Sequence, residues 1–525
     1  MTIGCPRGAG TVARFWQSCY HASVVTPPFS KILIANRGEI AVRVIRACRE
    51  MGIATVAVFS EADREALHVL LADEAVPIGP APAAESYLSA EKLIAAARAT
   101  GAQAVHPGYG FLAENASFAD ACATAGLVFI GPPPAAVRAM GDKMAARRVA
   151  LSLGVPVVPG ASEPVTDDKD AARVAEDVGY PVMLKAVMGG GGKGMRLVHR
   201  REDLAGALRA ARSEAGAAFG DASVYIERYL AAPRHVEIQI LADAHGSTVH
   251  LGERECSIQR RHQKLIEESP SPGVDAELRR RMGAAACRLA AAVGYVNAGT
   301  AEFLVDAHGS FYFLEMNARL QVEHPVTELV TGRDLVREQL RIAAGEKLGY
   351  GQEDIAWSGA AIECRINAED PDQGFLPSPG YITRLSAPAG PWVRNDSGVY
   401  AGYTVPRYYD TLMAKLIVWA PDREAAVARM ERALGEYQVG GVRSTIPVLR
   451  RILRHPDFVA GKLDTQFMER LDDAPVPGRH RTVALIAAAL AAYERAGRET
   501  PPAAAPTVSA WARLGRPGYS GSRPR

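Results

Sequence analysis

The chain after position 30 alternates short apolar runs with stretches of helical periodicity. Residues 31–36 (KILIAN) form an apolar run that predicts a strand, residues 39–51 predict a helix, and residues 54–60 (ATVAVFS) predict a second strand. The apolar positions of the helix recur on one face: Ile40, Val44, Ile45 and Cys48. Apolar residues at this spacing point into a core.

The same alternation continues to about residue 132. Three further apolar runs predict strands, with a helix near residues 91–100 between the first two: EAVPIG, AVHPG and LVFIGP. Strands that alternate with helices pair in parallel and are covered on both faces. We therefore predict a doubly wound, Rossmann-like α/β domain over residues 30–142. The glycines after its first strand do not follow GxGxxG, which argues against a dinucleotide site there.

Residues 143–350 predict a second domain of mixed character. A helix is expected around residues 143–153, and a strand from Pro181 (PVMLKA) runs into the glycine-rich residues 189–194. Residues 223–345 then alternate five β-rich runs with one helix near 276–293, a pattern typical of an α+β domain. Two of the runs, EFLVD and FYFLE, flank a short loop over residues 307–310 and predict a β-hairpin.

A third block and two terminal segments complete the chain. Residues 360–472 hold short apolar runs and two helical stretches, which predict a C-terminal domain. Residues 473–525 contain a helix near 483–495 followed by an Ala/Pro-rich tail, which we interpret as a flexible terminus. Residues 1–29 carry arginines but no acidic residue and lack an amphipathic repeat, so we expect a disordered or misassigned extension.

Composition narrows the class of protein. The 525 residues predict several domains, because single hydrophobic cores stop growing near ~250–300 residues. The net charge of +2 provides no positive excess for nucleic acid, and no apolar run reaches the length of a membrane span. Seven cysteines lie far apart without a CxxC pair, which is typical of free thiols in a reducing compartment. We therefore expect a cytoplasmic protein that binds neither nucleic acid nor membrane.

The predicted hairpin places two acidic residues opposite each other. Pairing about its loop sets Glu302 against Glu315, with Cβ atoms roughly 5 Å apart. Like charges at that distance repel unless a cation lies between them, and Mg²⁺ favours one or two carboxylates with water and phosphate oxygens. Asn317 adds an amide oxygen two residues on. We predict a divalent-metal site at these three residues; the alternative is a solvated pair of acids on one strand face.

Arg319, Gln321 and Glu323 continue the every-second-residue spacing beyond Asn317. An extended chain would present them along one edge, beside the metal site. Arg319 has the planar fork suited to a small oxyanion such as bicarbonate, and Glu323 is a candidate general base. Without the neighbouring metal motif, these residues would be interpreted as surface charges.

Phosphate binding is predicted upstream of the hairpin. The glycine loop at residues 189–194 follows a strand, and such loops lay backbone N–H groups against phosphate oxygens, although this one lacks the GK[ST] ending of a P-loop. Lys185 at the strand end and Lys143 at a helix start would supply point charges for the phosphates of ATP. Taken alone, each lysine is compatible with an ordinary surface position.

Two further segments carry candidate binding groups. Residues 227–230 (ERYL) have the pattern of a connector that meets an adenine ring through backbone groups and an apolar side chain. Residues 256–264 (CSIQRRHQK) gather polar donors, including Gln259, His262 and Lys264, as an anion pocket does. An exposed basic segment is the alternative interpretation of this run.

Together and in this order, the motifs resemble the biotin carboxylase component of the biotin-dependent carboxylases, within the ATP-grasp superfamily. The resemblance covers about residues 30–470. It is carried by IANRGEIA (34–41), HPGYGFLAEN (106–115), MGDK (140–143), LKAVMGGGGKGMR (184–196), PRHVEIQ (233–239), SIQRRHQK (257–264), LEMNARLQVEHPVTE (314–328) and ECRINAEDP (363–371). It implies a Rossmann-like domain over residues 30–142, an ATP-grasp domain over 143–350 with a mobile lid at about 158–225, and a C-terminal biotin carboxylase domain over 360–472.

The resemblance also implies roles for individual residues. Positions that match the ATP site are Lys143, Lys185, Gly191, Gly192, Glu227, Arg228, Tyr229, Leu230, His235, Gln259, His262, Glu302 and Glu315. Two Mg²⁺ or Mn²⁺ ions match Glu302, Glu315 and Asn317, and bicarbonate matches Lys264, Arg319, Gln321 and Val322. Arg365 matches the residue that stabilises the biotin enolate. The implied catalytic set is therefore Arg319, Glu323, Arg365 and Lys264. Arg228 stands where a lysine is expected, but the contact there is largely made by the backbone.

The reaction implied by the resemblance is ATP-dependent carboxylation of biotin. Glu323 deprotonates bicarbonate, which attacks the γ-phosphate of ATP to give carboxyphosphate and ADP, and the carboxyl group then passes to biotin. The sequence contains no Met-Lys-Met, the tripeptide around a biotinylated lysine, so we expect biotin to arrive on a separate biotin carboxyl carrier protein. A separate carboxyltransferase and a homodimer are also expected. The stretches NARLQVEHPVTE and LIEESPSP favour the acyl-CoA carboxylase branches, as in the acetyl-CoA carboxylase of fatty acid biosynthesis.

Three alternatives remain open on the sequence. Another ATP-grasp ligase, of the carbamoyl-phosphate type, shares carboxyphosphate chemistry but would depend on ammonia. A regulatory or assembly protein without catalysis is disfavoured, because every predicted functional position carries a residue that can perform its chemistry. A dinucleotide oxidoreductase would bind NAD(P)H.

Overall fold

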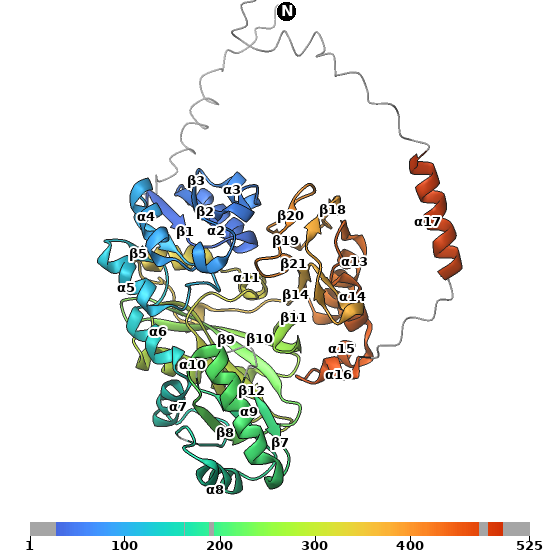
Figure 1. Cartoon of the computed structure of the whole chain (residues 1–525). Coiled ribbons are helices and arrows are strands. Elements are labelled where there is room, and N and C mark those ends of the chain that lie inside the picture. The colour runs from blue at the N-terminus through green and yellow to red at the C-terminus, as the bar shows by residue number, and fades with distance from the viewer. Residues whose placement is uncertain (1–27, 162, 188–193, 472–480, 497–525) are drawn as a thin grey trace, which may run out of the picture. The chain divides into compact units, whose positions relative to one another are not determined.

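A computed structural model describes residues 28–161, 163–187, 194–471 and 481–496 of the chain (Figure 1). The chain divides into two compact units, residues 1–471 and 472–525. The described part of the second unit is one helix, α17 (Arg481–Ala496), where the sequence predicts a helix. Nearly all of the predicted N-terminal extension and the whole tail after residue 496 lie outside the described residues.

Five parallel strands form the first sheet, in the order β3-β2-β1-β4-β5. Its strands are β1 (Lys31–Ile34), β2 (Ala54–Ser60), β3 (Glu74–Gly79), β4 (Ala104–His106) and β5 (Val128–Phe129). The connecting helices are α2 (Gly38–Glu50), α3 (Leu67–Leu71), α4 (Ala90–Thr100) and α5 (Ala116–Thr124). Ile32 and Ile34 pack in one apolar cluster with α2, whereas Leu33 packs in another with α4 and α5. Both faces are therefore covered, which confirms the doubly wound prediction.

The predicted inward face of α2 is buried. Ile40, Val44, Ile45 and Cys48 are each at most 2% exposed. The one-turn helix α3 was not expected from the sequence pattern, because five residues are too few to display a helical period. The cysteines in the described part of the chain are free thiols, in agreement with the sequence: Cys48, Cys122, Cys256, Cys287 and Cys364.

A small antiparallel sheet, in the order β7-β6-β8, occupies the region predicted as the lid. Its strands are β6 (Val182–Ala186), β7 (Arg196–Val198) and β8 (Val224–Arg228). Helices α8 (Asp168–Val178) and α9 (Arg201–Phe219) belong to this region, and α6 (Pro134–Gly141) and α7 (Lys143–Ser152) precede it. Residues of α8 and α9 share an apolar cluster with Val182, Leu184 and Ile226. Most of the glycine loop, including Gly191 and Gly192, lies outside the described residues.

One eight-stranded antiparallel sheet, in the order β13-β12-β9-β10-β11-β14-β21-β19, carries most of the remaining chain (Figure 1). Its strands are β9 (Arg234–Ala242), β10 (Thr248–Arg260), β11 (Gln263–Ser269), β12 (Asn297–Val305), β13 (Phe311–Asn317), β14 (Ala360–Asn367), β19 (Val393–Ser397) and β21 (Leu412–Ala420). β11 pairs with β14, so strands from before residue 350 and after residue 360 share this sheet. Side chains from both parts of the chain can therefore meet on one sheet face.

Helices of this region differ in number from the prediction. The expected helix is α10 (Ala276–Ala292), but α11 (His324–Thr331) and α12 (Leu335–Ala343) follow it. The prediction of a single helix over residues 223–345 is therefore wrong. Both missed helices are short, with eight residues in α11 and nine in α12, so each displays only about two turns of a helical period.

The C-terminal part contains the two predicted helices and several smaller elements. The longer helices are α13 (Arg423–Glu436) and α14 (Ile446–Arg454), and two one-turn helices follow, α15 (Pro456–Val459) and α16 (Phe467–Arg470). Short strands pair as β15 (Glu369–Asp370) with β16 (Leu376–Pro377), β17 (Gly380–Tyr381) with β20 (Thr404–Val405), and β18 (Arg384–Ser386) with β22 (Gln438–Gly440). Elsewhere in the described residues, 3₁₀ turns lie at Glu61–Asp63, Ala83–Glu85 and Gln352–Asp354, and one lies in this part at Pro371–Gln373.

Candidate active site

A cavity of about 1450 Å³ lies within the first unit and collects residues from the three-stranded and eight-stranded sheets and from loops that follow strands of the parallel sheet. Every predicted site residue that the structure describes lines it: Lys143, Lys185, Glu227, Arg228, Tyr229, Leu230, His235, Gln259, His262, Lys264, Glu302, Glu315, Asn317, Arg319, Gln321, Val322, Glu323 and Arg365. These residues span more than 220 positions of sequence, so the fold, rather than the chain order, brings them together.

The β12–β13 hairpin has the predicted register. Glu302 pairs with Glu315 directly across it, and a bulge follows at Phe303. The Nδ2 atom of Asn317 donates a hydrogen bond to Oε1 of Glu302 at 2.8 Å. Two carboxylates and an amide therefore face the cavity from one end of the hairpin, and all three carry oxygen atoms of the kind that Mg²⁺ prefers.

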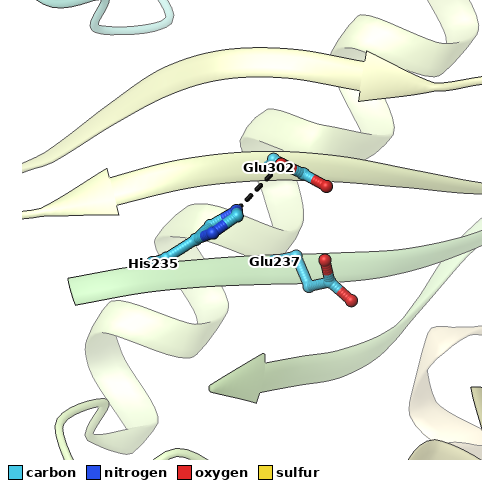
Figure 2. A group of neighbouring side chains, drawn as sticks. All are labelled: His235, Glu237 and Glu302. Carbon is cyan, nitrogen blue, oxygen red and sulfur yellow. Dashed lines mark hydrogen bonds and ion pairs between the residues drawn. The ribbon is translucent and has the colours of Figure 1, made fainter. Parts of the chain in front are cut away.

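Positive side chains flank this acid pair. His235 Nε2 lies 2.8 Å from Oε2 of Glu302, as Figure 2 shows, and Lys143 Nζ lies 3.5 Å from Oε2 of Glu315. Burial alone would raise the pKa of Glu302, but Lys264 and His235 outweigh burial and hold that pKa well below its usual range. Burial lowers the pKa of His235, yet Glu302 reverses that effect and the pKa is raised. Glu302 is therefore a carboxylate whose charge is matched by its neighbours.

Glu237 is a member of the site that the sequence did not single out. It lies on β9 beside Glu302, as Figure 2 shows, and is fully buried. Its Oε1 accepts a hydrogen bond from Nε of Arg254 at 2.5 Å, and its Oε2 accepts one from Nζ of Lys264 at 2.7 Å. His235, Glu237 and Glu302 also form a group whose ligand atoms lie within 4.8 Å of one another. The sequence alone does not indicate this group, because its members come together only when β9 pairs with β12. Glu237 does lie within the PRHVEIQ stretch, but that stretch did not mark it as a site residue.

Lys264 lies at the centre of three glutamates. Its Nζ is 2.6 Å from Oε1 of Glu323, 2.7 Å from Glu237 and 3.5 Å from Glu302. Burial lowers the pKa of Lys264, but its anionic neighbours raise that pKa well above the usual value. The ammonium group is therefore permanently charged near neutral pH, as a counter-charge for an anionic reactant requires.

Glu323 is completely buried between two cations. Besides the contact with Lys264, its Oε2 lies 3.0 Å from a terminal guanidinium nitrogen of Arg365. Burial would raise the pKa of Glu323, but Lys264 and Arg365 hold the pKa well below its usual range. The side chain is therefore ionised near neutral pH.

The prediction that residues 315–323 form one extended edge is wrong beyond Asn317. β13 ends there, the chain bends, and Glu323 precedes the first residue of α11. The bend has two visible causes: the backbone N–H of Ala318 bonds to Oε1 of Glu114 at 2.9 Å, and Leu320 is drawn into the core with no exposed surface. Arg319, Gln321 and Glu323 nevertheless reach the same cavity.

Arg319 is held by three side chains. Its Nε donates to Glu114 at 2.9 Å, and its terminal nitrogens donate to Gln321 at 2.8 Å and to Asn317 at 3.1 Å. Glu114 was not predicted as a site residue, although it lies within the HPGYGFLAEN stretch. These three contacts fix the orientation of the guanidinium plane.

Arg365 arrives from β14 and links two buried glutamates. Its Nε donates to Oε1 of Glu267 at 2.6 Å, and it also contacts Glu323. Burial raises the pKa of Glu267 to about 7, and Arg365 acts against that rise. Glu267 was missed because it acquires its role only when β11 lies beside β14.

The opposite end of the cavity suits a nucleotide. Lys185 forms an ion pair with Glu227, while Tyr229 and Leu230 continue from the end of β8. Apolar side chains line this end as well: Met183, Leu197, Leu304 and Leu314. The terminal guanidinium of Arg228 donates to the carbonyl of Val178 at 3.1 Å, so its charge is directed to the backbone. Apolar walls with a few polar groups are typical of a site for a flat aromatic base.

The polar run at residues 256–264 folds into the β10–β11 hairpin. Arg261 and His262 form its turn with φ values of 48° and 66°. His262 and Gln259 line the cavity, whereas Arg260 donates to the carbonyl of Gly374 at 2.7 Å. Burial, followed by Lys185 and His235, lowers the pKa of His262. The run therefore contributes to the cavity wall, although its turn residues Arg261, His262 and Gln263 are exposed.

An aromatic end of the cavity was not predicted. Tyr109, Phe111, Tyr408 and Tyr409 line it together with Arg37. The guanidinium carbon of Arg37 lies 4.3 Å from the ring centre of Tyr409. No sequence pattern indicates this grouping, because the residues come from loops about 70 and 300 positions apart.

Within the described residues, no helix combines the length and apolar character needed to cross a membrane. Three family profiles match the chain. Residues 28–137 match the biotin carboxylase N-terminal domain, residues 142–350 match the ATP-binding domain of the carbamoyl-phosphate synthase L chain, and residues 363–470 match the biotin carboxylase C-terminal domain.

Similar proteins extend over nearly the same residues. A biotin carboxylase of Nostoc sp. is 56% identical over 444 residues, which cover 85% of this chain and 99% of the relative. Biotin carboxylase 1 of Bacillus subtilis is 53% identical over 443 residues, which cover 84% of this chain and 98% of the relative. The biotin carboxylase domain dimer of Hydrogenobacter thermophilus 2-oxoglutarate carboxylase, solved with MgADP, ADP and bicarbonate, matches with a TM-score of 0.82 at 49% identity. That match covers 85% of this chain and 99% of the solved one.

Proposed function

The chain belongs to the biotin carboxylase family, and from this membership we propose that it carboxylates biotin on a separate carrier protein. ATP and bicarbonate are the other substrates, and the reaction is the first half-reaction of an acyl-CoA carboxylase. The chain is a ligase of the biotin carboxylase type. The identities of the individual site residues, the carrier and the final acceptor are part of the proposal.

One observation carries the proposal: the Glu323 carboxylate lies between Lys264 at 2.6 Å and Arg365 at 3.0 Å in the wall of a cavity that Lys143 and Lys185 also line. Three groups therefore meet at one point. Glu323 is the base for bicarbonate, Lys264 balances the charge of the resulting dianion, and Arg365 is the cation for the second substrate. An enzyme that only hydrolyses ATP would not require a buried base flanked by two cations in this part of the cavity.

Charge neutralisation would supply most of the rate in the first step. Lys143 and Lys185 border the nucleotide end, where they can balance the charge that spreads over phosphoryl oxygens during transfer. Bicarbonate would lie against Lys264, Arg319, Gln321 and Val322, lose its proton to Glu323, and attack the γ-phosphorus of ATP with ADP as the leaving group. The products of that step are carboxyphosphate and ADP.

The carboxyl group would then pass to biotin near Arg365. Carboxyphosphate breaks down to CO₂ and phosphate, the phosphate takes the N1′ proton of biotin, and the N1′ atom attacks CO₂. The Arg365 guanidinium would stabilise negative charge on the ureido oxygen during this step. Enclosure of the site limits hydrolysis of carboxyphosphate by water.

The donor set beside the nucleotide end fits divalent cations. Glu302 and Glu315 line one cavity wall together with Asn317, whose amide oxygen accepts from Arg319 at 3.1 Å, and we propose that these three residues hold Mg²⁺ or Mn²⁺. When bound, such ions neutralise phosphate charge and orient the phosphate groups. His235 and Lys143 already hold the two carboxylates in place at 2.8 Å and 3.5 Å.

The test is phosphate release from ATP by the full chain, with bicarbonate and Mg²⁺, in the presence and absence of free biotin. We expect bicarbonate-dependent hydrolysis that free biotin stimulates. Turnover that requires ammonia instead of biotin would contradict the proposal and support the second candidate, a ligase of the carbamoyl-phosphate type. That candidate has one observation in its favour, the match of residues 142–350 to a carbamoyl-phosphate synthase profile.

The partners follow from the same family. We propose a biotin carboxyl carrier protein and a carboxyltransferase as partners, and a homodimer, by analogy with the dimeric Hydrogenobacter domain. Trp392 supports a protein interface, because it is 60% exposed and its ring centre lies 4.9 Å from that of Trp419. Sedimentation velocity should show a dimer that Trp392→Asp weakens; an unchanged distribution would remove this residue from the interface.

The acyl acceptor is best identified by reconstitution. The native complex, purified through this chain, should carboxylate acetyl-CoA or propionyl-CoA when supplied with ATP and bicarbonate. Carboxylation of pyruvate alone would contradict the acyl-CoA assignment while leaving the biotin half-reaction intact.

A further inference from the structure

Lys415 lies on β21 outside the cavity, yet it contacts three residues that line it. Its Nζ donates a hydrogen bond to the carbonyl oxygen of Val322 at 2.7 Å and lies 3.2 Å from Oε1 of Glu39. The same nitrogen lies 5.9 Å from the ring centre of Tyr109. Val322, Glu39 and Tyr109 all line the cavity, whereas the side chain of Lys415 has no exposed surface.

These contacts join segments that are far apart in the sequence. Glu39 lies on α2, Tyr109 follows β4, Val322 precedes α11, and Lys415 arrives from the C-terminal part of the eight-stranded sheet. The hydroxyl of Tyr109 donates to Oε1 of Glu39, so the lysine, the glutamate and the tyrosine form one connected group. Lys415 therefore links the parallel-sheet domain to the loop that carries the anion-binding residues.

A fully buried ammonium group is costly to maintain. Removal of such a charge from water costs several kcal/mol unless partners compensate, and apolar residues of similar volume are often tolerated in place of a buried ion pair. Packing alone therefore does not explain a lysine at this position. Lys415 contacts the backbone carbonyl of Val322 as well as the Glu39 carboxylate, which indicates that it holds the backbone at Val322 in place.

The geometry of the peptide bond shows what that contact fixes. The Val322–Glu323 peptide is trans, because the only cis bonds in the described chain precede Pro181 and Pro270. A peptide unit is planar, so a fixed Val322 carbonyl also fixes the amide of Glu323 and the Cα atom from which its side chain projects. Glu323 in turn lies 2.6 Å from Lys264 and 3.0 Å from Arg365.

We propose that Lys415 is a positioning residue for the carboxylation reaction: its buried ammonium group fixes the Val322–Glu323 peptide, and thereby the Glu323 carboxylate, at the anion-binding end of the cavity. The proposal rests on the proposed function, since it assigns the position of the base that acts on bicarbonate. Lys415 touches none of the reactants. Its effect is confined to the bicarbonate end, because the nucleotide end is built on β6, β8 and α7.

The test uses the full chain with Lys415→Met, which keeps the length of the side chain but removes its charge and its donor. We expect kcat/KM for bicarbonate to fall roughly 30-fold to 100-fold, since small misplacements of a reacting group cost about that much. KM for MgATP should stay within about three-fold. Arg423→Met is the matched control, because Arg423 pairs with buried Glu268 at 2.6 Å in the same part of the chain and does not line the cavity.

A double variant covers the case in which Lys415→Met does not fold. Lys415→Met with Glu39→Gln leaves no uncompensated charge from this pair and keeps an acceptor for Tyr109, so it should fold and show the same loss at the bicarbonate end. An unchanged kcat/KM for bicarbonate in either folded variant would overturn the proposal. An equal loss in Arg423→Met would also overturn it, because the effect would then be general destabilisation.

Failure of the proposed function would look different. The wild-type chain would then show no bicarbonate-dependent and biotin-stimulated hydrolysis at all. If the wild type has that activity, only the Lys415 assignment is at stake in the comparison of variants.

Discussion

Glu302 and Glu315 face each other across the β12–β13 hairpin, and each is matched by a different cation. His235 lies 2.8 Å from Glu302, while Lys143 lies 3.5 Å from Glu315. The two cations come from β9 and from the start of α7, so the repulsion between the acids is offset from two sides. The fold itself therefore supplies the charges that hold the acid pair together.

Glu315→Gln tests the proposed metal site with almost no change in shape. Loss of one carboxylate should weaken the apparent affinity for Mg²⁺ at least ten-fold and lower the ATP-dependent rate about 100-fold, because the oxygen donors hold the ion that neutralises phosphate charge. Titration of phosphate release with Mg²⁺ measures both quantities. Glu436→Gln, which removes a carboxylate from an ion pair with Arg432 outside the cavity, should leave both unchanged.

Arg365→Lys separates the two half-steps of the reaction. A lysine keeps the charge but cannot contact Glu267 and Glu323 through a planar fork. We expect biotin-stimulated turnover to fall about 100-fold while KM for MgATP changes less than three-fold. The measurement is phosphate release with and without free biotin. Retained stimulation by biotin at the wild-type level would refute the role assigned to Arg365.

Local sequence pattern was sufficient for the elements whose partners are close in the chain. The parallel strands from Lys31 to Phe129 and the register of Glu302 against Glu315 follow from apolar spacing and loop length. The family motifs supplied the remaining site positions that line the cavity. The bend after Asn317 could not be predicted, because it depends on Glu114, which lies about 200 residues upstream.

Strand order within the eight-stranded sheet explains what was missed. Glu237 becomes a partner of Lys264 only because β9 lies between β12 and β10, and Glu267 meets Arg365 only because β11 pairs with β14. Lys415 likewise reaches Val322 from a strand 93 residues away. Periodicity reports which face of a strand is buried, but not which strand will lie beside it.

Glu237→Gln tests one of these missed residues. Glutamine keeps an acceptor for Arg254 but removes the negative charge that faces Lys264 at 2.7 Å. The amide nitrogen that then faces Lys264 cannot accept its hydrogen bond, so the ammonium group is no longer held in position for a bound anion. We expect KM for bicarbonate to rise about ten-fold, with KM for MgATP nearly unchanged. Equal increases in both constants would indicate a general distortion of the cavity instead.

Glu328→Gln tests a buried ion-pair network by its dependence on pH. Glu328 accepts from Arg43 at 2.8 Å and from Arg394 at 2.6 Å. Burial would raise its pKa, but Arg43 and Arg394 lower the pKa well below its usual range. A carboxyl whose pKa is lowered by folding stabilises the folded state above its unfolded pKa of about 4.3, and that contribution is lost as pH falls toward the folded pKa.

The variant should therefore lose about 3–5 kcal/mol of stability at pH 7, because two guanidinium groups lose a buried counter-charge. The difference in free energy of unfolding between the variant and the wild type should narrow steadily below about pH 4.3, because the stabilisation by the wild-type carboxylate is lost there. Urea unfolding midpoints at pH 7, 5 and 3.5 measure this difference, with Glu436→Gln as the exposed control. A difference in stability that is the same at all three pH values would show that Glu328 acts through the hydrogen bonds it accepts rather than through its charge, since a glutamine fills nearly the same volume.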